Sequence, residues 1–406
     1  MTKPKMFEKP SGVRDYLPDA VTKLKYIERQ SLNCMSQWGY EQIVTPSMEF
    51  YDTVGMASAT LDHKLFKLLN QRGTAMVLRS DMTAPIARVA SSLMQEAELP
   101  IRLSYHANVF RSMEEDSGRE AEFYQTGAEL IGDASPEADA EVIALSISCL
   151  QAAGVKQFKV AIGHHGFLHG LLEQYLPDQD EVQHQLKQYL VQRDVVGYRE
   201  LVQELAIDEV KKGQLNQILR LRGGIPVIAE ARHMAQEESV RASLQHLELL
   251  WEVLDAYGVA EMCMLDLSMV GDFSYYTGTI FEGYAADQGS PVMSGGRYDN
   301  LLTQFGRPAP ATGFALKTTR LMDALRLNEA HQASLPVLIQ YDEWRRAEAF
   351  QEAARLRAQG ERVITRRVNE EEQLEEVERR QDQQLFWRGN RYQEILTFVR
   401  FLKEHV

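Results

Sequence analysis

The chain has 406 residues, a formal net charge of −14 at pH 7 and 44% hydrophobic residues. This balance is typical of a folded globular protein and argues against intrinsic disorder. The length suggests two or three domains. A protein this acidic lacks the basic surface that is expected of a general nucleic-acid binder.

The cysteines and the apolar segments narrow the location. Cys34, Cys149 and Cys263 lie far apart and form no CxxC pair, so we expect neither a disulfide framework nor a cysteine-based zinc site. This cysteine usage favours a reducing compartment, here the cytoplasm. No apolar run reaches the roughly 20 residues of a membrane span, and the first residues contain no secretory h-region.

Helix and strand signals alternate in the first 100 residues. Asp19 is expected to cap a helix that runs to about Trp38, with an apolar stripe formed by Val21, Leu24, Ile27, Met35 and Trp38. Residues 41–46 predict a short strand, and residues 65–69 and 74–78 predict a hairpin. A further helix is expected after Pro85, with four residues facing inward: Ile86, Val89, Ala90 and Leu93.

The middle of the chain predicts a sheet interrupted by helices. Residues 101–110 and 122–131 predict an antiparallel strand pair, and Ser135-Pro136 opens a helix. Residues 166–258 are rich in Gln, Glu, Leu and Arg and predict a helical insertion. Beyond them we expect strands at 261–269, 277–284, 291–294 and near Gly313, and helices at 298–305 and from Thr318.

The end of the chain predicts a separate small domain. Residues 324–335 resemble a linker, and residues 336–406 begin with a β-α-β pattern that fades after Arg367. We therefore expect an α+β core over residues 1–323 and a small α/β domain after the linker.

Common catalytic motifs are missing. The sequence contains no GxxxxGK[ST], HExxH or GxSxG and no Rossmann glycine fingerprint. His165 and His169 are four residues apart, with His164 beside them, but no nearby carboxylate completes a metal-ligand pattern. Surface or helix-capping roles are the better interpretation of these histidines. We expect neither a metal nor a cofactor.

Two polar regions are candidates for a ligand site. Gln125, Gly127 and Glu129 alternate and so point to one face of a strand, and Arg111 ends the strand before it. Polar groups on a sheet face are costly unless they are solvated or bound, so this face predicts a ligand site or an internal Arg111–Glu129 network. Residues 274–279 and 294–299 predict a tight polar pocket, or a turn beside core aromatics.

Together these segments resemble class II aminoacyl-tRNA synthetases of the histidyl-tRNA synthetase branch. The resemblance spans about residues 7–322 and rests on the opening segment 10–18, motif 1 (38–49), motif 2 (110–125), the histidine signatures 275–278 and 295–299, and the start of motif 3 (311–315). It implies an antiparallel sheet flanked by helices and a two-fold interface around Trp38, Tyr40 and Ile43. It also implies a histidine pocket formed by Asp81, Thr83, Arg111, Gln125, Glu129, Tyr275 and Tyr276.

The departures from that family fall on the ATP side of the site. The family has a carboxylate, two arginines and a glycine at positions that here are Met113, Ala121, Gly271 and Lys317. Losing one oriented cation can cost about 3 kcal/mol of transition-state stabilisation. The amino-acid side survives, although Asp81 is one carbon shorter than the residue of the family. A histidine pocket without ATP machinery is the pattern of a sensor.

This pattern is similar to the family of ATP phosphoribosyltransferase regulatory subunits, which are bacterial paralogues of histidyl-tRNA synthetase. The resemblance implies a non-catalytic homodimer that assembles into a hetero-oligomer with a short-form catalytic subunit. It implies L-histidine as the feedback effector of the first step of histidine biosynthesis. We do not expect tRNA as a partner, because the tail matches only part of an anticodon-binding domain. The alternatives are an active histidyl-tRNA synthetase and a pseudo-synthetase that regulates another partner.

Overall fold

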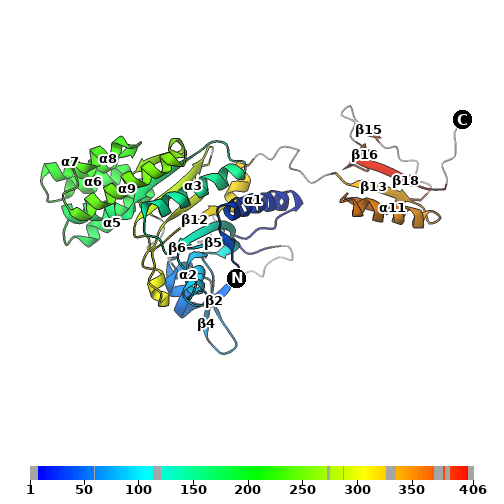
Figure 1. Ribbon diagram of the computed structural model, residues 1–406, viewed down its shortest axis with the longest axis horizontal. Coiled ribbons are helices and arrows are strands. Elements are labelled where there is room, and N and C mark those ends of the chain that lie inside the picture. The colour runs from blue at the N-terminus through cyan, green and yellow to red at the C-terminus, as the bar shows by residue number, and fades with distance from the viewer. Residues whose placement is uncertain are drawn as a thin grey trace. The chain divides into compact units, whose positions relative to one another are not determined.

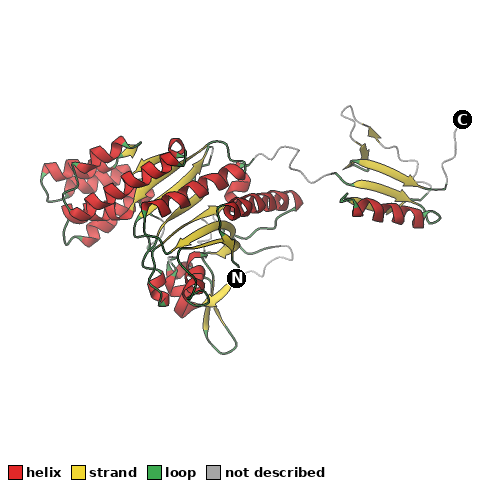
Figure 2. Ribbon diagram, viewed as in Figure 1, coloured by secondary structure: helices red, strands yellow, loops and turns green. Residues whose placement is uncertain are grey.

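The computed structural model describes residues 8–58, 60–112, 120–271, 275–286, 288–325, 335–369, 378–379 and 385–400. The chain divides into two compact units, Met1–Arg326 and Leu327–Val406, and each is described by itself. Figures 1 and 2 show the elements of both units. Within the described parts of the chain, no helix is long and apolar enough to cross a membrane.

A nine-stranded sheet organises the first unit, with the strand order β1-β5-β6-β12-β11-β10-β7-β9-β8. Its strands are β1 (Glu41–Gln42), β5 (Ile101–Phe110), β6 (Glu122–Ile131), β12 (Ala311–Lys317), β11 (Met293–Arg297), β10 (Thr279–Ala285), β7 (Phe158–His164), β9 (Cys263–Asp266) and β8 (Arg222–Gly223). Neighbours are antiparallel from β5 to β7, whereas the pairs β1–β5 and β7–β9 are parallel. The predicted β5–β6 pair is confirmed.

Helices α1 (Pro18–Gln37), α3 (Pro136–Ala152) and α10 (Thr318–Ala324) cover one face of this sheet (Figure 1). Their apolar residues form the main core, to which α1 contributes Leu24, Ile27 and Met35. The start of α1 differs from the prediction, because Leu17 is the N-cap and Pro18 opens the helix. A proline lacks the N–H that a first helical position leaves unpaired, so Asp19 lies inside the first turn instead of capping it. Val21 is also not buried, with 38% of its surface exposed.

The motif 1 residues pack within the chain. Tyr40 is buried, and its hydroxyl donates to Glu141 Oε1 at 2.8 Å. Trp38 packs against Tyr257 with ring centroids 5.6 Å apart. Tyr40 therefore belongs to the core of one chain, and its expected place at a two-fold interface is wrong.

The opposite face of the sheet carries α2 (Thr83–Ser91), the 3-10 helix η4 (Leu302–Phe305) and a second core cluster. A small sheet lies beside it, in the order β2-β4-β3, formed by β2 (Met48–Phe50), β4 (Ala75–Leu78) and β3 (Lys67–Leu69). The predicted β3–β4 hairpin is confirmed. The helix α2 begins before Pro85 and ends before Leu93, so Leu93 is 84% exposed and the inward position predicted for it is wrong. The predicted helix at 298–305 is reduced to η4.

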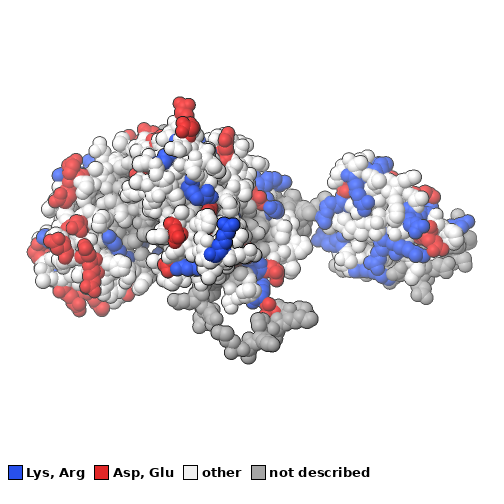
Figure 3. All heavy atoms as spheres, turned by 90° about the horizontal axis from the view of Figure 1, so that it is seen from below, with Lys and Arg blue, Asp and Glu red and all other residues white. Residues whose placement is uncertain are grey.

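The helical insertion follows β7 and packs on the same core as α3. Its helices are α4 (His165–Tyr175), α5 (Asp180–Gln192), α6 (Val195–Glu204), α7 (Glu209–Ile218), α8 (Pro226–Arg232) and α9 (Glu238–Ala256). The helices predicted between residues 166 and 258 are thus present, whereas the short strand β8 among them was not expected. Acidic side chains gather over this part of the molecule in Figure 3.

The second unit contains a parallel three-stranded sheet in the order β14-β13-β18. The predicted β-α-β pattern corresponds to β13 (Val337–Tyr341), α11 (Arg346–Ala358) and β14 (Val363–Arg367). The pattern does not end there, because β18 (Glu394–Phe398) returns to pair with β13 after the short strands β15 (Glu378–Arg379), β16 (Leu385–Trp387) and β17 (Asn390–Tyr392). Most of the predicted linker, residues 326–334, lies outside the described residues.

Candidate functional site

A small pocket opens on the face of the large sheet where β6, β12 and β11 lie side by side. It encloses about 370 Å³, part of it open to solvent. This is near the lower end of the range for small-molecule sites. Six of the seven predicted histidine-binding residues line it: Asp81, Thr83, Gln125, Glu129, Tyr275 and Tyr276.

Glu129 is the central polar group of the pocket. Its side chain is buried and accepts hydrogen bonds from Thr83 Oγ1 at 2.9 Å and from the Tyr298 hydroxyl at 2.5 Å. Burial raises the pKa of Glu129 to about 8, and the negative charge of Asp81 adds to this effect, although both hydrogen bonds oppose it. The empty pocket thus holds a carboxyl group that is largely protonated at pH 7. Such a group can share a proton with a nitrogen base of the ligand.

Gly313 makes room for that carboxyl group. It is the β12 residue in register with Glu129, and its neighbour on the other side is Gly296 of β11. A Cβ atom at position 313 would lie 1.8 Å from Glu129 Oε2, far inside any allowed contact. The glycine therefore allows a buried carboxyl group to lie directly on the sheet.

Asp81 is held at the start of α2. Its Oδ2 accepts from Ser58 Oγ at 2.6 Å, and its Oδ1 accepts from the backbone N–H of Ala84 at 3.0 Å. The second contact satisfies one of the unpaired N–H groups at the beginning of the helix. Asp81 and Glu129 give the pocket two acidic side chains, which suits a ligand that carries nitrogen donors.

An aromatic wall closes the pocket. The Tyr275 ring lies 5.3 Å from the Tyr276 ring and 5.6 Å from the Tyr298 ring. Burial raises the pKa of Tyr275 and of Tyr298 well above the ordinary value, so both hydroxyls remain neutral donors. Sequence reasoning did not select Tyr298, although it stands in a quoted signature between Arg297 and Asp299. It also missed Ser58, for which the sequence offers no signal, because its contact with Asp81 forms only in the fold.

Arg111 is the predicted site residue that lines a neighbouring, larger cleft instead. Its Nε donates to the carbonyl oxygen of Ser80 at 2.9 Å, which places the guanidinium beside Asp81. The cleft has seven basic and four acidic lining residues, which are Arg14, Arg111, Lys159, Arg193, Arg222, Lys317 and Arg320, and Glu120, Asp266, Glu282 and Asp323. Glu129 has Thr83 and Tyr298 as hydrogen-bond partners, so it is built into a pocket wall.

The positions that depart from the synthetase pattern can be located in part. A Cβ atom at Gly271 would lie 2.6 Å from Tyr276 Cδ2, so a longer side chain there requires the pocket tyrosine to move. Ala121 is buried, and its N–H donates to the carbonyl oxygen of Gly12 at 2.7 Å. Lys317 lines the larger cleft. Met113 lies outside the described residues.

The three neighbouring histidines do not form a metal site. Among the described residues, no group of three or more His, Cys, Asp or Glu side chains is placed to hold a metal ion. His164 is buried at the end of β7, so the surface role predicted for it is wrong. Burial chiefly, with the neighbouring His246, lowers the pKa of His164 to about 3, and this histidine therefore stays neutral.

Known proteins with similar sequences and structures share one family. Residues 12–321 match the family model of histidyl-tRNA synthetase. An ATP phosphoribosyltransferase regulatory subunit from Bacillus licheniformis is 47% identical over 359 residues, which are 88% of this chain and 91% of the relative. The regulatory subunit from Bacillus subtilis is 42% identical over 372 residues, which are 92% of this chain and 94% of the relative.

One solved structure supports the fold directly. The crystal structure of an ATP phosphoribosyltransferase regulatory subunit/histidyl-tRNA synthetase from Bacillus halodurans is similar at a TM-score of 0.88 and 41% identity, and the match covers 98% of this chain and 100% of that one. The expected class II synthetase-like α+β fold is confirmed.

Proposed function

The chain belongs to the histidyl-tRNA synthetase family and, within it, to the ATP phosphoribosyltransferase regulatory subunits, and from this premise we propose that it is a non-catalytic subunit that senses histidine for a separate catalytic partner. The observation that carries the proposal is the intact acidic and aromatic pocket around Glu129, next to a cleft in which the expected ATP-side groups are replaced. The proposed partner is a short-form ATP phosphoribosyltransferase subunit, and the proposed effector is L-histidine.

The chemistry of the pocket fits each part of histidine. The imidazole N–H donates to Glu129, whose carboxyl group shares a proton with the ring. The ammonium group faces Asp81, and the carboxylate of histidine faces the guanidinium of Arg111 at the edge of the larger cleft. Gln125 and the tyrosines complete the polar lining. Thr83 holds Glu129 in place.

The ATP side supports a non-catalytic role. Adenylate formation depends on cations that stabilise charge around a phosphorus centre. Gly271 stands at the position of the catalytic arginine, and the close contact with Tyr276 leaves no room for a side chain there. The cleft retains basic residues, but Arg14 pairs with Glu120 and Arg222 pairs with Asp266.

We expect the purified chain to show no histidine-dependent exchange of pyrophosphate into ATP, because that reaction needs the missing arginine. A histidyl-tRNA synthetase assayed in parallel is the positive control. Mixed with a short-form catalytic subunit, the chain should co-purify with it and confer phosphoribosyl transfer to ATP that histidine inhibits. Robust pyrophosphate exchange by the chain alone, or a mixture that neither assembles nor gains activity, contradicts the proposal.

We further expect a homodimer, formed by the small sheet instead of by Tyr40. Val44 is 83% exposed, Met48 55% and Phe50 52%, a concentration of apolar surface that a second copy can bury symmetrically. Light scattering should give about twice 46.2 kDa. Phe50→Glu should shift the equilibrium to the monomer, whereas Leu249→Glu on an exposed part of α9 should not. A wild-type monomer at micromolar concentration would exclude this interface.

A further inference from the structure

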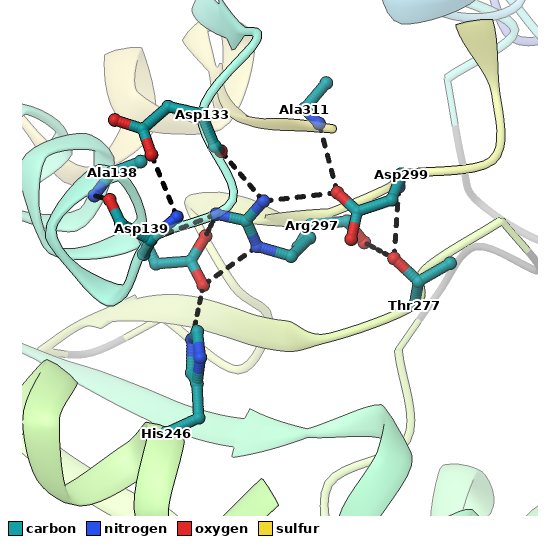
Figure 4. Close-up of polar contacts among 9 residues, drawn as sticks. Asp133, Ala138, Asp139, His246, Thr277, Arg297, Asp299 and Ala311 are labelled. Atoms are coloured by element: carbon teal, nitrogen blue, oxygen red, sulfur yellow. Dashed lines mark hydrogen bonds and ion pairs between the residues drawn. The ribbon is translucent and has the colours of Figure 1, made fainter. Parts of the chain in front are cut away.

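A buried ionic network lies directly behind the pocket wall (Figure 4). Arg297, the last residue of β11, is 4% exposed and forms a two-point contact with Asp139 of α3. The distances are 2.8 Å from Nη2 to Oδ1 and 3.1 Å from Nε to Oδ2. Burial by itself raises the pKa of Asp139, but hydrogen bonds from His246 and Arg297 and the positive charge of Arg297 lower it further, so the carboxylate is the ionised partner.

The guanidinium of Arg297 has no donor left for a ligand. Besides Asp139, Nη1 donates to the carbonyl oxygen of Asp133 at 3.0 Å and to Asp299 Oδ1 at 3.1 Å, and Nη2 donates to the carbonyl oxygen of Ser135 at 3.3 Å. An arginine carries five N–H groups, and all five have acceptors here. Such a saturated side chain fixes the position of its own backbone, which makes Arg297 a positioning residue.

The backbone that Arg297 fixes belongs to the pocket. Its chain neighbours Gly296 and Tyr298 both line the cavity, and Tyr298 holds Glu129. The carbonyl oxygen of Arg297 accepts the N–H of Thr277 at 2.8 Å, and Thr277 follows the pocket tyrosines in the chain. The Thr277 hydroxyl in turn accepts the N–H of Asp299 at 3.0 Å. Two walls of the pocket therefore share one anchor.

The same anchor reaches the helical insertion. His246 of α9 donates from Nε2 to Asp139 Oδ2 at 2.8 Å. Its ring packs edge-on against His164, with centroids 5.6 Å apart, at the junction of β7 and α4. The next residue, His165, donates its N–H to the carbonyl oxygen of Gly278 at 2.8 Å, so the insertion also contacts the end of the tyrosine segment. Asp139 is thus bound from the pocket side by Arg297 and from the insertion side by His246.

We infer that the Arg297–Asp139–His246 network couples ligand occupancy of the pocket to the order of the helical insertion, with His246 as a positioning residue outside the pocket. The inference rests on the proposed binding of histidine. A ligand on Glu129 and the tyrosines restricts β11 and residues 275–278, and the saturated arginine passes that restriction to Asp139 and α9. Because coupling between two sites is reciprocal, loosening α9 at His246 must weaken ligand binding.

The test compares His246→Leu, which cannot donate to Asp139, with His246→Gln, whose amide can donate from a similar position. His184→Leu is the matched control, because His184 is an exposed histidine of the same insertion on α5. Calorimetry with L-histidine and hydrogen exchange of residues 238–256, with and without histidine, are measured on the full chain. We expect histidine to slow exchange in α9 of the wild type. His246→Leu should bind histidine about 5- to 20-fold more weakly and lose that response, and His246→Gln should recover most of both.

Two results separate the inference from the proposed function. Wild-type protein that binds histidine without slower exchange in α9 overturns the coupling and leaves the sensor function standing, and this measurement decides even if His246→Leu does not fold. A folded His246→Leu variant that binds and responds like the wild type also overturns it. Wild-type protein that gives no binding signal at all overturns the sensor function, and the inference with it.

Discussion

Alanine at position 313 will abolish histidine binding, with an affinity loss of at least 100-fold. The added Cβ atom would lie 1.8 Å from Glu129 Oε2 and 2.7 Å from the carbonyl oxygen of Ala128. The backbone oxygen is fixed by the sheet, so the Glu129 side chain must move and give up Thr83 and Tyr298. Calorimetry of Gly313→Ala against the wild type measures the effect.

The control for this variant is Gly213→Ala. Gly213 lies within α7, and nothing is close to the space that its Cβ atom would occupy. Alanine there should leave histidine binding unchanged and stabilise the helix by up to about 1 kcal/mol. If Gly313→Ala binds histidine within a few-fold of the wild type, then Glu129 is not at the binding site and the pocket assignment fails. Circular dichroism must show that the variant is folded.

The sequence was sufficient for features that depend on local patterns. The alternation in residues 122–131 placed Gln125 and Glu129 on one face, and both line the pocket. The Ser135-Pro136 pair predicted the start of α3, where Ser135 accepts from the N–H of Ala138. These predictions hold because side-chain direction in a strand and capping at a helix end are set by adjacent residues.

Features that depend on distant contacts could not be read from the sequence. His164 has no buried pattern of its own and becomes buried because His246, far away in the chain, packs on it. Arg111 stands at the end of a strand, and only the fold decides that it lines the larger cleft. Leu93 has the right helical spacing, but α2 ends before it. A saturated arginine such as Arg297 looks the same in the sequence as one that binds a ligand.

Glutamine at position 129 should weaken histidine binding while it stabilises the unliganded protein. Glutamine has almost the same shape and keeps partners for Thr83 and Tyr298, but it cannot become a carboxylate. A hydrogen bond to a charged group contributes about 1.5–3 kcal/mol, so we expect histidine affinity to fall roughly 10- to 100-fold. Glu200→Gln, on the exposed surface of α6, is the control and should change neither property.

The stabilisation should depend on pH in a defined window. The pKa of Glu129 is raised from 4.5 to about 8 in the folded state, so the protonated group contributes its full stability below pH 4.5. That contribution is lost as the pH rises through about 8, at a rate of up to about 1.4 kcal/mol per pH unit. Glu129→Gln lacks this loss. Its advantage in urea denaturation should therefore grow from pH 5 to pH 8 and then level off.

Histidine binding by the wild type should follow the same two protonation equilibria. The complex holds one proton between the imidazole, with an ordinary pKa of about 6.5, and Glu129, with a pKa of about 8. Between these values the free partners already carry that one proton in total, on the carboxyl group, so affinity should be nearly constant. Below about pH 6.5 binding must release a proton, and above about pH 8 it must take one up, so affinity should fall on both sides. In Glu129→Gln the fall above pH 8 should disappear, because the neutral imidazole is then the bound form. A variant whose affinity still falls above pH 8 in parallel with the wild type would show that Glu129 does not share the proton.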